Sequence, residues 1–169
     1  MLNLNRDEPT FPKEHLMKAL RRTAVQSMFV VAAALVGVTT AEAGVSCHKI
    51  NAKGAGQDNF NLTTTAQIIG GGLLQGTTQA SFGVTGGTAT LLDIAGTVMF
   101  TTHQATLTVS VTGKFNLETG EFKASGPVTA ATGKLTGATG DLVLKGVEDL
   151  ATGKFVEDVS GEICVDLAK

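Results

Sequence analysis

The chain has 169 residues, and its 13 Lys and Arg side chains against 15 Asp and Glu side chains give a formal net charge of −2 at pH 7. That balance excludes the strongly basic surface that nucleic-acid binding requires, and it offers an anionic membrane surface no basic patch to attract. Trp and Tyr are absent, and only two cysteines are present. Once an N-terminal targeting segment is set aside, the length favours one folded domain with a modest core.

Residues 18–43 have the three parts of a secretory signal. Three basic side chains lie within 18–22, and the apolar run MFVVAAALVGV follows at 28–38. The sequence AEA at 41–43 then supplies the small residues of a cleavage site, so we expect cleavage before Gly44. The protein is therefore predicted to be secreted or periplasmic.

An acidic stretch precedes the basic region of this signal, which predicts that translation starts at Met17. Residues 1–43 are then an N-terminal extension with a cleaved signal helix, and residues 44–169 form the mature domain. The alternative is a single-pass anchor helix, but the apolar run is too short to span a bilayer. We expect no stable membrane insertion after cleavage.

Cys47 and Cys164 lie near the two ends of the mature chain. In an exported protein such a pair is most simply a disulfide, which here would tie the first strand to the last. Cys164 alternates with the apolar side chains of its segment, so we expect the bond on the outer surface or at a rim. The alternative is a lipoprotein with its lipid on Cys47, but Gly44 stands where such a motif usually has Leu.

Strand signals dominate the mature chain, because no long window sustains apolar residues at helical spacing. Segment 104–115 alternates apolar and polar side chains, which is typical of a strand with one buried face, and segment 155–167 repeats the alternation. The Gly triplet within 67–76 predicts a strand interrupted by a loop or bulge. We expect strands over 45–51, 78–84, 88–102, 104–115, 120–131, 141–148 and 154–167.

Two segments share one turn pattern. NLETGEF at 116–122 and DLATGKF at 149–155 each begin with Asn or Asp, continue with Thr-Gly and end with Phe. An Asx side chain can hold the start of a type I turn, while the glycine, Gly120 or Gly153, adopts a left-handed backbone. We therefore predict a hairpin connection at each segment.

The segment AATGKLTGATGDLVLKG at 130–146 poses a choice between a phosphate-binding loop and turns between strands. The P-loop pattern G-x-x-x-x-G-K-[ST] is absent from the sequence, and the spacing of Gly133, Gly137 and Gly140 fails the pattern G-x-G-x-x-G. The residues after Gly140 also alternate like a strand, whereas both motifs need a helix there. We therefore expect no nucleotide site and assign these glycines to structural turns.

Short turns between strands that each have one apolar face predict an all-β domain over 44–169. The expected fold is a single small antiparallel β-barrel of about eight strands, with a β-sandwich as the alternative. Closure into a barrel would remove the open edges that such a Thr- and Val-rich sheet otherwise exposes.

The segment GKLTGATGDLVLKG at 133–146 is similar to the signature of the allene oxide cyclase barrel and dirigent-like superfamily, in which G-x-[FL]-x-G-A-x-G precedes a barrel strand. The likeness extends to GGLLQGTTQASF at 71–82, ATLTVSVTGKFNLETGEFKASG at 105–126 and GKFVEDVSGEICVDL at 153–167. The resemblance implies an eight-stranded antiparallel barrel whose interior can hold a small apolar molecule. Some members cyclise hydrophobic substrates or guide their coupling by steric confinement, and many bacterial members that look like this chain have no known function.

Two carboxylates interrupt apolar rows and are the candidate catalytic residues. Glu157 lies between Phe155 and Val159 on the apolar face of the last segment, and Asp93 stands in LLDIAG. Inside a barrel, desolvation would raise the pKa of Glu157 and make it a general acid or a hydrogen-bonding anchor for a ligand. The alternative for both residues is a position at a barrel end or beside a bulge.

His48 and His103 have no second and third ligands at the spacing a metal site needs, so no metal or cofactor is expected. Three functions stay open. The leading hypothesis is an exported barrel that binds or sterically guides a small apolar ligand. The second is a cofactor-free cyclase or isomerase assisted by Glu157 or Asp93, and the third is a structural or interaction protein of the envelope or extracellular space, in which oligomers are possible.

Overall fold

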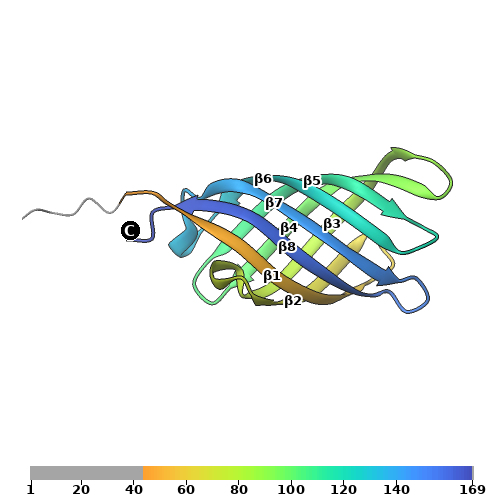
Figure 1. Ribbon diagram of the computed structural model, residues 1–169, viewed down its shortest axis with the longest axis horizontal. Coiled ribbons are helices and arrows are strands. Elements are labelled where there is room, and N and C mark those ends of the chain that lie inside the picture. Colours follow the sequence, from red (N-terminus) through yellow and green to blue (C-terminus); the bar gives the residue numbers. More distant parts are fainter. Residues whose placement is uncertain (1–43, 169) are drawn as a thin grey trace, which may run out of the picture. The chain divides into compact units, whose positions relative to one another are not determined.

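The computed structural model describes residues 44–168, so the predicted start at Met17 and the predicted signal peptide lie outside the described residues. Eight strands and two single-turn 3-10 helices make up the described part of the chain (Figure 1). In chain order they are β1 (Ser46–Asp58), β2 (Thr63–Gly70), η1 (Gly72–Leu74), β3 (Gly76–Gly87), β4 (Leu91–Thr102), β5 (Thr106–Asn116), β6 (Glu121–Ala131), η2 (Gly133–Leu135), β7 (Thr139–Asp149) and β8 (Lys154–Val165).

The eight strands close into one barrel. Every strand pairs antiparallel with the next, and β8 pairs back onto β1 from Ser46 opposite Val165 to Gln57 opposite Lys154. The ring of pairings leaves none of the eight described strands at an open edge, which removes the surface through which isolated sheets aggregate. The predicted barrel is confirmed, and the β-sandwich alternative is wrong.

Alternating side chains fill one half of the barrel, as the pattern in segment 104–115 predicts. Leu107, Val109 and Val111 of β5 are at most 1% exposed, while Ser110 and Thr112 between and beside them lie on the outer face. Burying an aliphatic side chain of this size contributes about 1.5–3 kcal/mol. Inward side chains of the other strands complete this hydrophobic core, among them Ile50, Ile68, Val98, Phe100, Leu142, Val159, Ile163 and Val165.

The end of the barrel that carries η1 and η2, called the closed end here, is sealed by two leucines. Leu74 of η1 is 0% exposed and Leu135 of η2 is 2% exposed, and both belong to the core. Gly71 and Gly133 have φ angles of 70° and 59°, a left-handed backbone that glycine adopts without steric cost. The two Gly-rich segments therefore turn the chain between strands and direct one leucine each into the barrel.

The opposite end, called the open end here, carries the connections β1–β2, β3–β4, β5–β6 and β7–β8 (Figure 1). Asn116 Oδ1 accepts a hydrogen bond from the backbone N–H of Glu118 at 2.8 Å, and Asp149 Oδ1 accepts the corresponding bond in the β7–β8 turn at 2.9 Å. The two predicted hairpin turns are therefore confirmed. Of the glycines that the sequence assigns to turns, Gly120, Gly133, Gly137 and Gly153 lie between strands and have positive φ. Gly140 also has positive φ, but it lies within β7, opposite Ile163 of β8, and not in a turn.

A disulfide crosses the seam between the first and last strands. Cys47 and Cys164 are directly opposite in the β1–β8 register, with their Cα atoms 3.9 Å apart. Cys47 is exposed and Cys164 is half-buried, so the bond lies on the outer face. The predicted disulfide is confirmed, and a thiol held in this bond is not available to carry a lipid.

Strand β1 is longer than predicted, because Gly54 and Gly56 suggest a break where the strand continues. Glycine is depleted in strands, which is why the predicted strand ends at residue 51. In the barrel a Cβ on Gly54 would lie 2.7 Å from the Cγ of Glu157, and one on Gly56 would lie 2.5 Å from the ring of Phe155. Both glycines therefore make room for large side chains of β8.

Candidate functional site

The interior of the barrel is not filled at the open end, where it encloses a cavity of about 240 Å³. All eight strands contribute to its wall, and most of the lining side chains are aliphatic or aromatic. Phe82, Phe115, Phe122 and Phe155 supply its aromatic surface. The cavity reaches the rim of the barrel beside Leu62, which is exposed.

Glycines on neighbouring strands determine where two of these rings lie. Phe122 is opposite Gly146 in the β6–β7 register, and Phe155 is opposite Gly56 in the β1–β8 register. A Cβ on either glycine would approach the ring opposite it to 2.5 Å, so each ring lies over bare backbone. The rings meet edge to face, with centroids 5.9 Å apart and an interplanar angle of 84°. This arrangement, favoured for aromatic pairs, keeps both rings against the wall.

Glu157 is the most buried ionisable side chain of the cavity. It is 7% exposed, and its neighbours in the register are Gly54 on β1 and Gly146 on β7, which leave space for the carboxyl group. No residue of the described chain forms a hydrogen bond or ion pair with it. Burial raises the pKa of Glu157 to about 7, because the charged form is disfavoured away from water. Both protonation states are therefore accessible near neutral pH.

Two further carboxylates line the cavity nearer its rim. Asp58 ends β1, and its Oδ1 atom accepts a hydrogen bond from the backbone N–H of Phe60 at 2.8 Å. Glu148 lies near the end of β7, and burial raises its pKa to about 7, with a further contribution from the negative charge of Asp58. Among the described residues no Lys, Arg or His lines the cavity. The site is a mainly apolar pocket whose ionisable side chains are all acidic.

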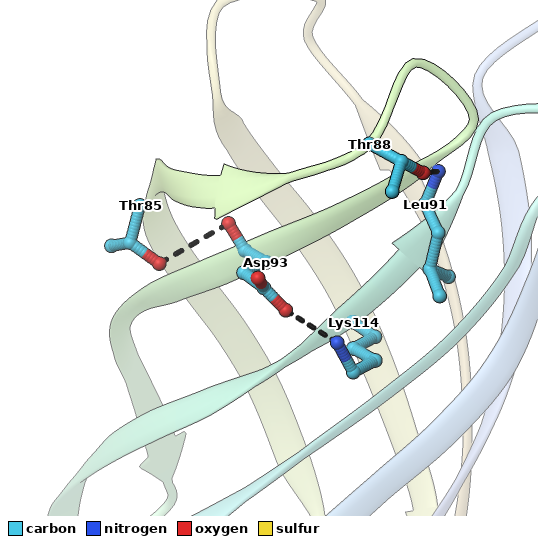
Figure 2. Close-up of polar contacts among 5 residues, drawn as sticks. All are labelled: Thr85, Thr88, Leu91, Asp93 and Lys114. Atoms are coloured by element: carbon cyan, nitrogen blue, oxygen red, sulfur yellow. Dashed lines mark hydrogen bonds and ion pairs between the residues drawn. The ribbon is translucent and has the colours of Figure 1, made fainter.

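Asp93, the second candidate from the sequence, lies outside the barrel. Its Oδ1 atom accepts a hydrogen bond from the Lys114 ammonium at 2.6 Å across the β4–β5 pair, and its side chain is 42% exposed (Figure 2). Thr85 donates a hydrogen bond to the backbone carbonyl of Asp93 at 3.3 Å, which ties β3 to the same position (Figure 2). The structure thus separates the two candidates: Glu157 faces the cavity, and Asp93 faces away from it.

Sequence reasoning missed Asp58 and Glu148, although a signal for each is present. Glu148 falls on the same alternating row as Leu142 and Leu144, so the period of two places it inward. Asp58 continues the inward row of β1, but the glycines of that strand hide the pattern. Continuing the alternation through glycine would have brought both carboxylates to the same barrel end as Glu157.

One group of metal-ligand residue types is brought together in the described chain, by Cys47, Glu162 and Cys164. Both sulfur atoms are held in the disulfide, and a metal would need them as thiolates. This group lies at the β1–β8 seam of the closed end, away from the cavity. These three residues therefore do not form a metal-binding site in the cavity.

Comparison with protein-family models, with curated proteins and with solved structures finds no match to this chain. No helix within residues 44–168 has the length and apolar character needed to cross a membrane. Function therefore has to follow from the geometry and chemistry of the cavity.

Proposed function

We propose that the protein is an exported binding module that takes one small, mainly apolar molecule into the open end of its barrel. The observation that carries this proposal is the cavity of about 240 Å³ between the Phe side chains. An apolar protein cavity of about 150 Å³ binds benzene, so this one has room for one ring system with a short substituent. The disulfide supports an exported location, since such bonds persist in oxidising compartments.

Membership in the allene oxide cyclase barrel and dirigent-like superfamily is part of this proposal. The eight-stranded antiparallel barrel is the architecture that the resemblance implies. A protein of this kind would act on its ligand by confinement: the Phe-lined wall restricts the conformations that an apolar molecule adopts inside. Such guidance needs no cofactor and few polar groups.

A second candidate function, a cyclase or isomerase, is favoured by one specific observation. Glu157 is buried in the cavity without a partner, and its pKa of about 7 suits proton transfer at neutral pH. In a cyclase or isomerase of this kind, Glu157 would donate a proton to the confined substrate or accept one from it. The variant Glu157→Gln would then bind the substrate but would not convert it.

Indole is a suitable probe for the binding function, because it is a small neutral ring system and a fluorophore. The protein has no Trp and no Tyr, so the emission of bound indole is free of protein background. We expect saturable binding with a blue shift of the emission as indole leaves water for the Phe-lined cavity.

The matched variants are Ala80→Phe and Gln79→Phe. Ala80 lines the cavity, so a ring there fills it, whereas Gln79 is exposed on the outer face of the same strand. Binding retained in Gln79→Phe and lost in Ala80→Phe, with unchanged far-ultraviolet circular dichroism in both, would support the proposal. Indole that fails to saturate the unmodified protein, or that binds both variants equally, would refute it.

A further inference from the structure

We propose that the molecule held in this cavity is an amine: a small apolar ligand whose protonated nitrogen is received by the carboxylates of Glu157, Glu148 and Asp58. This inference rests on the proposed binding function and assigns the chemical class of its ligand. The apolar part would lie against the Phe side chains, and the ammonium group would face the acidic part of the wall.

The charges around the cavity select for a cation. Its ionisable groups come from three strands: Asp58 from β1, Glu148 from β7 and Glu157 from β8. The described side chains that β2 to β6 contribute to the wall are apolar, apart from Thr64 and Thr78. A ligand with a carboxylate would add a further negative charge and meet no basic partner, which makes the wall repulsive to fatty acids and other anions.

The second observation is that the buried carboxyl group of Glu157 has no hydrogen-bond or ion-pair partner among the described residues. A buried carboxyl group is costly unless a donor pairs with it, and no described residue supplies one. In the described chain, every fully buried side-chain oxygen has a hydrogen-bond partner. Since the oxygens of Glu157 have none, they are not fully buried. They therefore keep some exposed surface, and Glu157 lines the cavity. An ammonium group has three donors and no acceptor, the complement that this position lacks.

The pair at the rim points to the same chemistry. The negative charge of Asp58 makes ionisation of Glu148 harder, so the two groups repel each other when both are charged. A bound cation relieves that repulsion and favours the ionised form of Glu148. Binding of an amine is therefore expected to release protons from the protein near neutral pH, which a neutral ligand of the same shape would not do.

Three probes with one ring system distinguish the classes: tryptamine, 3-ethylindole and indole-3-acetate. At about pH 8 we expect tryptamine to bind at least about ten-fold more tightly than 3-ethylindole, the effect of one charge-assisted hydrogen bond, and indole-3-acetate to bind most weakly. Tryptamine affinity should rise several-fold from about pH 5.5 to about pH 8, because the carboxylates ionise while the amine stays charged. All binding should be lost in Ala80→Phe.

The variants Glu157→Gln and Glu148→Gln should each reduce the preference for tryptamine over 3-ethylindole, and should weaken its pH dependence. Each variant tests the proposal separately, so it stays testable if one of them does not fold. Glu162→Gln, on the outer face of β8, is the matched control and should change neither. Equal binding of tryptamine and 3-ethylindole, or tighter binding of indole-3-acetate, would overturn the amine proposal alone. Failure of all three probes to bind would overturn the binding function itself.

Discussion

Replacing Glu157 with Gln should stabilise the protein at alkaline pH and leave its stability in mild acid almost unchanged. The carboxyl group is buried in the barrel, and burial raises its pKa from the ordinary 4.5 to about 7. Between these two values the folded protein binds more protons at this site than the unfolded chain does. The free energy of unfolding therefore falls as pH rises through this range, and the stabilisation present below about pH 4.5 is lost once pH exceeds about 7.

The size of the effect follows from the difference between the two pKa values, about 2.5, at about 1.4 kcal/mol for each pKa unit. Ionisation of Glu157 thus costs the unmodified protein about 3–4 kcal/mol by about pH 8.5. Gln has nearly the same shape and does not ionise. In Glu157→Gln this cost is absent, so the variant should be the more stable protein by about that amount at alkaline pH.

Urea unfolding followed by far-ultraviolet circular dichroism, at about pH 4 and about pH 8.5, measures this difference. The signal has to come from the backbone, because the chain has no Trp and no Tyr. Asp93→Asn is the control, since it removes an exposed carboxylate whose ion pair is worth less than about 1 kcal/mol. If Glu157→Gln and the unmodified protein lose stability in parallel between the two pH values, the burial assigned to Glu157 is wrong.

Two further predictions concern the closed end and the seam. Leu74→Ala should lower the free energy of unfolding by about 2–5 kcal/mol, because Leu74 is fully buried where it seals the barrel; a loss below about 1 kcal/mol in urea unfolding would contradict that role. Replacing Cys47 and Cys164 together with Ser should cost up to about 5 kcal/mol, since the bond joins residues 117 apart in sequence. A reductant should destabilise the unmodified protein similarly and leave the double variant unaffected; equal stability of oxidised and reduced protein would count against this.

The barrel could be predicted from sequence where side chains alternate without interruption. β5 is the clearest case, because Leu107, Val109 and Val111 all face the core as the pattern predicts. The turn at Asn116 could be predicted equally well, since it depends on one side chain and one glycine that are close in sequence. Local chemistry determines both features, and local chemistry is what a single sequence records.

The site was harder to predict from the sequence, because it depends on which residues face one another across strands. The space for Glu157 is created by Gly146 and Gly54. Gly146 faces it across the β7–β8 hairpin, whereas Gly54 is far from it in sequence and becomes its neighbour only when β8 pairs with β1 in the closed barrel. Gly54 and Gly56 also hide the continuation of β1, and with it the inward position of Asp58. A glycine that weakens a strand pattern is the residue that makes room inside the barrel.

A crystal structure of the protein grown with indole tests ligand binding inside the barrel most directly. We expect one indole inside the open end of the barrel, in contact with Phe122 and Phe155 and absent from crystals of Ala80→Phe. Indole bound only on the outer surface, or a cavity closed by side chains in the crystal, would contradict it.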